Sequence, residues 1–321
     1  MKKICVMHQA SIGDTLMATP VYRAIKECYP QCKTVVITSY LGYELLYKNP
    51  YIDVLIPYKK GDAVFPIIKA IWRSEAALIL DYHYRNVLYS FLSMIPKRVR
   101  YGHNFINIKL TDRQYDKFEA FNYLQLAEQI GIHTNDLSLT RPYIAPEERE
   151  HVDKIYNEVK SSFRYLIIIA PYSLSRIKDW SPVNYCEIIE RFKSSNCAAA
   201  VIGGKNQYEI VNKEIPNAIN LAGKTNLRES AELISRADLQ ICGCTSMLHV
   251  CSTTNTPVIA IYGPTSDKQW APRKNCIVIN HQLDCSPCYN VAGKEPCSDA
   301  HCLTEISVDE VWNAVKKVLN L

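Results

Sequence analysis

The residue types that could carry chemistry lie mostly where an apolar run of the sequence ends. The first such place is residues 8–20, HQASIGDTLMATP, in which Gly13 precedes the carboxylate of Asp14. A loop that binds a dinucleotide phosphate needs several glycines, as in G-x-G-x-x-G, and this stretch has one. Since Asp14 would repel a phosphate, it is either a general base facing a cleft or a carboxylate that caps a helical turn. We expect Thr19 and Pro20 to start the following helix, which leaves Asp14 in the loop ahead of it.

A second loop with useful chemistry spans residues 170–182 and follows the most apolar run of the chain. It places Ser173, Ser175 and Lys178 ahead of a helix that we expect to begin near Ser181. Hydroxyls, a cation and a helix N-terminus together favour an anion. We therefore predict that Lys178 contacts a phosphate; the alternative is a solvated surface lysine.

Two further apolar runs, residues 238–244 and 257–263, each lead into small or polar residues. The residues that we expect to line a nucleotide diphosphate there are Thr245, Ser246, His249, Gly263, Pro264 and Thr265. Hydroxyls and the N–H groups at a helix start suit such a ligand. His249 would lie about one turn into a short helix, where the alternative is a core histidine that touches no ligand.

Four of the thirteen cysteines are clustered near the end of the chain, namely Cys285, Cys288, Cys297 and Cys302. A Cys-x-x-Cys pair followed by two further thiols could hold Zn²⁺ or iron tetrahedrally as a structural site. The alternatives are reduced thiols in a loop or a disulfide formed on purification. The other nine cysteines are scattered through apolar segments and are expected to act as small core residues.

Composition and charge limit the class of protein. Apolar residues make up 48% of the chain and charged residues 21%, as in an ordinary globular protein. The net charge of +5 is concentrated in residues 1–150, which carry +4. This excess is too small to indicate nucleic acid, and it suits an anionic small or lipid-linked substrate. Neither a signal-peptide core nor a membrane-spanning run is apparent, so we expect a cytoplasmic protein with reduced thiols.

Short β-branched runs alternate with helical patterns throughout the chain, which predicts an α/β fold with parallel sheets covered on both faces. The predicted strands are residues 3–7, 33–39, 53–58, 77–83, 165–171, 198–204, 238–244 and 257–263. The predicted helices include residues 21–29, 183–192, 227–237 and 307–321. Because ligands bind at the carboxyl ends of such strands, the loops after the strands are the candidate site.

The alternation occurs once in each half of the chain and predicts two Rossmann-like domains. A charged helical segment after two prolines, within residues 141–162, is the expected boundary. We assign residues 1–150 to the first domain, 151–305 to the second, and 306–321 to a final helix.

In combination, these segments resemble glycosyltransferase family 9, the ADP-heptose:lipopolysaccharide heptosyltransferases. The matching segments are GDTLMATPVYRAIK (residues 13–26), LILDYHYRN (78–86), PKRVRYGH (96–103), KDWSP (178–182), LAGKTNL (221–227), GPTS (263–266) and CSPC (285–288). The sequence departs from the family in the third loop, where Cys244 stands at the position of an acidic residue that contributes to donor binding in relatives. The identity of the transferred sugar therefore stays open.

The resemblance implies a GT-B architecture, with two Rossmann-like domains whose parallel sheets face a central cleft and a final helix that crosses back to the first domain. It also implies an inverting displacement that needs no catalytic metal, with Asp14 as general base and Lys178 stabilising the departing ADP. Expected donor-binding residues are Ser173, Ser175, Lys178, Gly223, Lys224, Thr245, Ser246, His249, Gly263, Pro264 and Thr265. Expected acceptor-binding residues are Gly13, Lys59, Lys60, Asp81, His83 and Arg85.

The implied partners are a nucleotide sugar, ADP-heptose in the leading interpretation, and a lipid-linked anionic glycan acceptor. The place of action would be the cytoplasm, with at most peripheral contact with the inner membrane, since no amphipathic basic helix stands out. One alternative is a glycosyltransferase that uses another nucleotide sugar or a protein acceptor. A second is a noncatalytic binding protein whose cysteines hold a metal. A Rossmann oxidoreductase is disfavoured because the sequence has no G-x-G-x-x-G turn.

Overall fold

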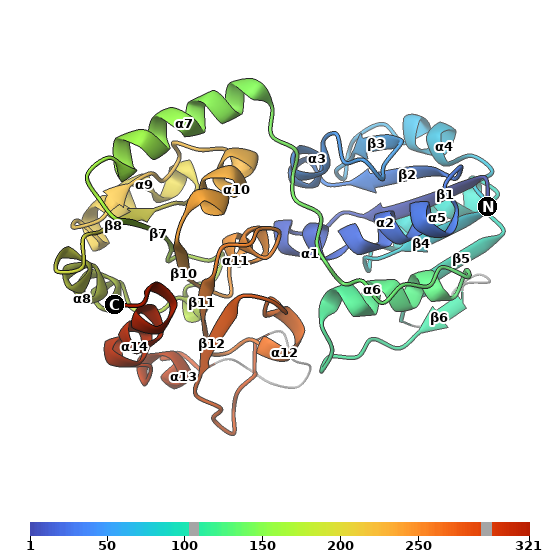
Figure 1. The fold of residues 1–321 in the computed structure, drawn as a ribbon. Helices are drawn as coiled ribbons and strands as arrows, with labels where there is room; N and C mark the ends of the chain where they lie inside the picture. Colours follow the sequence, from blue (N-terminus) through green and yellow to red (C-terminus); the bar gives the residue numbers. More distant parts are fainter. Residues whose placement is uncertain (103–108, 290–296) are drawn as a thin grey trace. The chain divides into compact units, whose positions relative to one another are not determined.

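The computed structural model describes residues 1–102, 109–289 and 297–321, which form two compact units, Met1–Tyr143 and Ile144–Leu321. Each unit contains a six-stranded sheet surrounded by helices (Figure 1). His103, the last residue of the PKRVRYGH segment, lies outside the described residues. None of the helices in the described part of the chain is long and apolar enough to cross a bilayer.

Unit 1 is built on one parallel sheet with the strand order β3-β2-β1-β4-β5-β6. Its strands are β1 Lys3–His8, β2 Lys33–Thr38, β3 Val54–Pro57, β4 Ala76–Ile79, β5 Lys97–Tyr101 and β6 Lys109–Thr111. Its helices are α1 Ile12–Met17, α2 Thr19–Cys28, α3 Tyr40–Leu46, α4 Phe65–Ile71, α5 Tyr84–Leu92 and α6 Glu119–Glu128. The central strand β1 is fully buried from Ile4 to Met7, so both faces of the sheet are covered at that point.

Unit 2 repeats this architecture with the strand order β12-β11-β10-β7-β8-β9, again with parallel pairs. Its strands are β7 Tyr165–Ala170, β8 Cys197–Val201, β9 Ile219–Asn220, β10 Leu239–Gly243, β11 Val258–Tyr262 and β12 Cys276–Asn280. Its α-helices are α7 Pro146–Lys160, α8 Pro182–Lys193, α9 Tyr208–Glu214, α10 Leu227–Arg236, α11 Ser246–Cys251, α12 Asp267–Trp270, α13 His301–Thr304 and α14 Val308–Leu319.

The strand order fixes where each sheet can bind a ligand. In unit 1 the chain extends the sheet from β1 to β3 and then crosses to β4, on the other side of β1. In unit 2 it extends the sheet from β7 to β9 and then crosses to β10, on the other side of β7. The loops after β1 and β4, and after β7 and β10, therefore leave their sheets in opposite directions. Open parallel sheets bind their ligands at such a switch point.

The predicted α/β fold with two parallel sheets is confirmed, and each of the eight predicted strands corresponds to a strand of the structure. Four strands, β5, β6, β9 and β12, were not predicted. Strand β9 has two residues and β6 has three, too few for a pattern. Strand β5 reads KRVRY, in which the charges hide the strand although the side chains of Arg98 and Arg100 are buried.

The prediction for the opening loop was wrong in one respect. Gly13 and Asp14 lie in the helix α1 and not in a loop ahead of α2. The Ser11 side chain accepts a hydrogen bond from the backbone N–H of Asp14, and this N-cap lies eight residues before the expected N-cap Thr19. Thr19 is consequently the first residue of α2 rather than its N-cap.

The final helix α14 belongs to unit 2 through its packing. Its residues Val308, Val311, Val315 and Leu319 are buried in the core of that unit. The indole N–H of Trp180 donates to the carbonyl oxygen of Ile306 at 3.0 Å, just ahead of the helix. The apolar face of this helix is thus used within unit 2.

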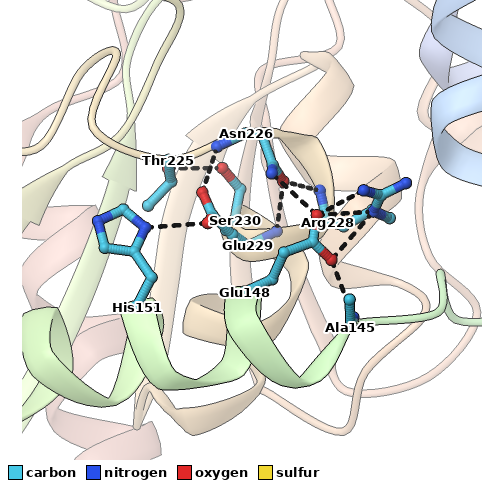
Figure 2. A network of polar contacts seen from close by, with 8 residues as sticks. All are labelled: Ala145, Glu148, His151, Thr225, Asn226, Arg228, Glu229 and Ser230. Atoms are coloured by element: carbon cyan, nitrogen blue, oxygen red, sulfur yellow. Dashed lines mark hydrogen bonds and ion pairs between the residues drawn. The ribbon is translucent and has the colours of Figure 1, made fainter.

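A polar network fixes the start of α7 against the start of α10 (Figure 2). The Glu148 carboxylate accepts hydrogen bonds from the Arg228 Nε–H and the Asn226 amide at 3.0 Å, and from the Ala145 N–H at 2.9 Å. Beside it, His151 Nδ1 lies 2.9 Å from a carboxylate oxygen of Glu229. Burial alone would raise the pKa of Glu148, but its hydrogen bonds to Arg228, Ala145 and Asn226 outweigh burial and lower that pKa.

We predict that Glu148→Gln lowers the free energy of unfolding at neutral pH by about 1–3 kcal/mol, because charge-assisted hydrogen bonds are lost at a largely buried site. The difference in unfolding free energy between the variant and the wild type should shrink in acid. As the pH falls through the lowered pKa of Glu148, protonation removes the same charge from the wild type. Urea unfolding at several pH values measures this. Glu147→Gln, at the exposed neighbouring position, is the control and should leave stability unchanged. Equal effects of the two substitutions would contradict the assignment.

Candidate active site

The Asp14 carboxylate in unit 1 is held by two hydroxyl groups. Ser11, the N-cap of α1, donates its Oγ–H to Asp14 Oδ2 at 2.6 Å. Tyr123, on α6, donates its hydroxyl to Asp14 Oδ1 at 3.3 Å. The carboxylate is partly exposed, so one side of it stays accessible while both oxygens are oriented. Ser11-x-x-Asp14 is a helix-start pattern that the sequence displayed, whereas nothing in the sequence pointed to Tyr123.

A buried histidine continues this chain of contacts. His8 Nε2, at the end of β1, lies 3.2 Å from the Tyr123 hydroxyl oxygen. Burial lowers the pKa of His8 despite the opposing effect of Asp14 and Asp81, and burial together with Asp14 raises the pKa of Tyr123. Both groups are therefore neutral at pH 7. Since Tyr123 has one proton and gives it to Asp14, His8 must donate from Nε2, which fixes its tautomer.

Asp81, two residues after β4, accepts several hydrogen bonds within unit 1. Its oxygens accept hydrogen bonds from the Gln9 N–H, the His83 N–H and the Asn86 amide at 2.9–3.0 Å. Asp81 therefore connects the loop after β1 to the start of α5. Arg85 lies on the same helix, α5, and its guanidinium donates to the side-chain oxygen of Gln9.

A pocket of about 490 Å³ opens beside these residues in unit 1. Its lining residues are Tyr58, Lys60, Gly61, Asp62, Val64, His83, Tyr84, Arg85 and Tyr89. Three predicted acceptor residues, Lys60, His83 and Arg85, are among them. Lys59 is not, and its ammonium group lies 5.4 Å from the centre of the Tyr40 ring. Gly13 is buried within α1. The three tyrosines of the lining were missed, because isolated tyrosines carry no motif.

The loop after β7 in unit 2 positions the predicted anion-binding residues. The Asp179 carboxylate accepts a hydrogen bond from the Ser173 N–H at 2.8 Å, and Ser173 Oγ donates to the Ser175 carbonyl oxygen at 2.7 Å. Lys178 closes a 3-10 turn, and its ammonium group lies 4.9 Å from the centre of the Tyr289 ring. A Cβ added to Gly243 would lie 3.0 Å from the Lys178 carbonyl oxygen, so this loop packs directly on the end of β10.

The ends of β10 and β11 carry buried hydroxyl groups. Thr245 and Thr265 are each 6% exposed, and neither hydroxyl has a hydrogen-bond partner among the described residues. His249 lies in the six-residue helix α11, where its ring meets the Trp270 ring edge-on at 5.9 Å. Both hydroxyls are therefore available to a polar ligand at the ends of these strands.

The remaining predicted donor residues lie on the same edge of the sheet. Ser246 is the first residue of α11, and Gly263 packs so closely that an added Cβ would lie 2.4 Å from Leu303 Cγ. The Pro264 carbonyl oxygen accepts hydrogen bonds from the Cys288 and Tyr289 N–H groups at 2.9 and 2.8 Å. Gly223, with a φ of 71°, and Lys224 follow β9, two strands away from β7.

The four clustered cysteines lie around the turn after β11. Cys288 and Cys302 are buried, whereas Cys285 and Cys297 are exposed. Burial, reinforced by the other three thiols, raises the pKa of Cys302 to about 11, so the four groups are near enough to interact. Within the described ranges, no group of three or more histidine, cysteine or carboxylate side chains has the arrangement of a metal site.

Comparison with known proteins decides the family. The model of "Glycosyltransferase family 9 (heptosyltransferase)" matches residues 97–298. The chain belongs to this family. Lipopolysaccharide heptosyltransferase 2 of Escherichia coli K12 is 26% identical over 293 residues, which cover 82% of this chain and 83% of that protein. A lipopolysaccharide core heptosyltransferase of Haemophilus influenzae is 24% identical to this chain. The matched region covers 99% of this chain and 97% of that protein.

Solved structures of this family share the fold. A family 9 glycosyltransferase of Veillonella parvula superposes with a TM-score of 0.83 at 21% identity, covering 99% of this chain and 97% of its own. The ADP-heptose heptosyltransferase II of E. coli superposes with a TM-score of 0.79 at 21% identity, covering 100% of this chain and 99% of that one. An iron-containing dodecameric glycosyltransferase of enterotoxigenic E. coli superposes with a TM-score of 0.60 at 14% identity. The superposition covers 99% of this chain and 76% of that one. The fold of this glycosyltransferase is thus GT-B, as the sequence predicted.

We predict that Thr265→Val in this family 9 enzyme leaves the free energy of unfolding of the ligand-free protein unchanged, or raises it by up to about 1 kcal/mol, because a buried hydroxyl without a protein partner is removed. Thr256→Val is the matched control: Thr256 is equally buried, but its hydroxyl donates to the Ile234 carbonyl oxygen at 2.7 Å. That control should lose about 1 kcal/mol. Urea unfolding measures both, and equal losses would show that Thr265 is bonded within the protein.

Proposed function

We propose that this chain is an inverting glycosyltransferase that moves heptose from ADP-heptose to the inner core of lipopolysaccharide or lipooligosaccharide. Asp14 is the general base, and the reaction takes place at the cytoplasmic face of the inner membrane. The observation that carries the proposal is the Asp14 carboxylate, oriented by Ser11 and Tyr123 at the switch point of unit 1. A carboxylate whose two oxygens are fixed and partly exposed suits proton abstraction from a sugar hydroxyl.

The proposed reaction is a single displacement. The acceptor hydroxyl gives its proton to Asp14 while its oxygen forms a bond to the anomeric carbon of the donor. The bond from that carbon to the diphosphate oxygen breaks, ADP leaves with the electron pair, and the configuration inverts. Lys178 and His249 counter the charge that builds on the diphosphate, and this is the task that a metal ion performs in other enzymes. The proposal therefore requires no catalytic cofactor.

The donor site of the proposal is the edge of the unit 2 sheet. Thr245 and Thr265 supply hydroxyls that have no partner among the described residues, and the 173–178 loop supplies the Lys178 cation. Ser173, Ser175, Ser246, Gly263 and Pro264 complete this site, with Gly223 and Lys224 placed for the nucleoside. The acceptor site is the pocket with Lys60, His83 and Arg85, whose cations suit an anionic glycan.

We predict that Asp14→Asn lowers turnover by about 10²-fold or more and leaves ADP affinity nearly unchanged, because the base is lost while the donor site is intact. Transfer from ADP-heptose to a heptose-deficient lipopolysaccharide acceptor measures turnover. Asp112→Asn, at an exposed carboxylate of the same unit, is the control. Wild-type turnover of Asp14→Asn would refute the base. A loss of turnover matched by a loss of folded protein would instead assign Asp14 to capping.

A second prediction concerns the donor site. Thr245→Val and Thr265→Val should each weaken ADP binding by about threefold to tenfold, the worth of one neutral hydrogen bond. Titration calorimetry with ADP measures this, and Thr256→Val should bind ADP like the wild type. Unchanged affinity in both variants would remove the two threonines from the site.

Cys244 keeps a second candidate function open. This buried thiol stands where relatives carry an acidic donor-binding residue, so the transferred sugar or its nucleotide can differ, and a protein acceptor stays an alternative. Thermal-shift measurements with ADP-, UDP- and GDP-sugars distinguish the donors. The largest stabilisation by the ADP-sugar supports the proposal, and a preference for another nucleotide would replace it.

The cysteine cluster carries a separate prediction of structural Zn²⁺ or iron. Cys285, Cys288, Cys297 and Cys302 supply four thiols close enough to interact electrostatically, and an iron-containing relative shares the fold. Metal analysis of protein purified under reducing conditions is the test. A stoichiometric metal supports the site, and its absence would leave four reduced thiols.

A further inference from the structure

Helix α5 buries Val87 and Tyr89 in the core of unit 1, yet it also exposes several large apolar side chains. The side chains of Tyr84, Leu88, Phe91 and Leu92 are between 48% and 71% exposed, and they occupy one face at helical spacing. The buried face includes Asn86 and Ser90, both fully buried. A surface helix of a globular protein normally presents polar residues on its exposed face. The outer face of α5 is therefore not explained by folding of this unit.

The exposed apolar surface extends beyond the helix. The Arg73 N–H donates to the Ser93 carbonyl oxygen at 2.9 Å, which joins the end of α4 to the end of α5. Trp72 and Met94, the residues next to this bond, are 43% and 61% exposed. We call the exposed set the α5 surface; it consists of Trp72, Tyr84, Leu88, Phe91, Leu92 and Met94.

Met94 adds a conformational argument. Its φ is 56°, in the left-handed region that ends many helices and that favours glycine or asparagine. A large apolar residue there costs backbone strain and exposes its side chain. Folding alone would favour a different residue, so Met94 is a second sign that this surface is used.

Four cations border the α5 surface, of which Arg98 and Arg100 are buried and two are exposed. The Arg98 guanidinium lies 5.3 Å from the centre of the Phe91 ring, and the Arg100 guanidinium lies 5.1 Å from the centre of the Tyr84 ring. Arg73 and Lys97 are exposed at the same end of the helices. Neither α4 nor α5 contains an aspartate or glutamate. Exposed Trp, Phe, Leu and Met side chains bordered by Lys and Arg match the interface of an anionic bilayer.

We propose that the α5 surface docks unit 1 onto an anionic lipid bilayer. A second copy of the chain fits less well, because a two-fold contact would bring the same cations face to face. The proposal rests on the proposed function for the reason why docking would be useful, namely that a lipid-linked acceptor is presented at a membrane. Tyr84 and Arg85, at the start of α5, line the unit 1 pocket, and the nine-residue helix is about 13 Å long. Docking would thus hold that pocket near the headgroups.

The test measures binding of the full chain to vesicles that contain neither glycan nor donor. Vesicles of phosphatidylcholine with about a third phosphatidylglycerol should sediment the wild type, and vesicles of phosphatidylcholine alone should bind it much more weakly. The triple variant Leu88→Ser, Leu92→Ser, Met94→Ser should bind the anionic vesicles about tenfold or more weakly. Lys97→Glu should weaken binding to the anionic vesicles only. The triple variant should unfold thermally like the wild type, because the three side chains are exposed.

Two controls separate this proposal from others. Val183→Ser removes an equally exposed apolar side chain on α8 in unit 2 and should bind like the wild type. Asp14→Asn should also bind normally, so failure of catalysis and failure of docking are distinguishable. The proposal is overturned if the wild type ignores anionic vesicles or if the triple variant binds them equally. It is also overturned if light scattering shows a wild-type dimer that the triple variant abolishes, which would make the occupant a second copy.

Discussion

In both units a parallel sheet is covered on its two faces, and the crossover helices leave only the strand ends open for polar chemistry. The chain reverses the direction in which it extends the sheet once per unit, after β3 and after β9. In unit 1 that reversal makes the loops after β1 and β4 leave the sheet in opposite directions. In unit 2 it does the same for the loops after β7 and β10. Asp14 and Asp81 follow the first pair, and Lys178 and Thr245 follow the second. The positions of these four candidate residues depend on this constraint.

The two switch points differ in how their polar groups are satisfied. In unit 1 the Asp14 carboxylate receives hydrogen bonds from Ser11 and Tyr123, and His8 in turn donates to Tyr123. Such a site is organised before any ligand arrives, which suits a group that must act in one geometry. In unit 2 the buried hydroxyls of Thr245 and Thr265 have no partner among the described residues. Such a site gains its hydrogen bonds when a ligand binds, which suits a donor pocket.

The sequence was sufficient for eight strands that read as apolar runs and for the loops that follow them, although our prediction missed the apolar strand β12. It was insufficient where burial depends on partners far along the chain. Arg98 and Arg100 are buried in β5 beside the rings of Phe91 and Tyr84, and no local pattern shows this. Tyr123 reaches Asp14 across 109 residues. The helix α1 was a different failure, since Ser11 and Asp14 display a helix-start pattern that our prediction passed over in favour of Thr19 and Pro20.

Helix α5 shows how the site and the surface depend on each other. Its buried polar residue Asn86 donates to both carboxylate oxygens of Asp81 and so fixes the loop after β4. Val87 and Tyr89 share the inner face with this polar contact, and the remaining large apolar residues of the helix lie on the outer face. Its first turn supplies Tyr84 and Arg85 to the pocket, and its later turns supply Leu88 and Leu92 to the α5 surface. Under the two proposals, one helix would link recognition of an anionic sugar to contact with the lipid that carries it.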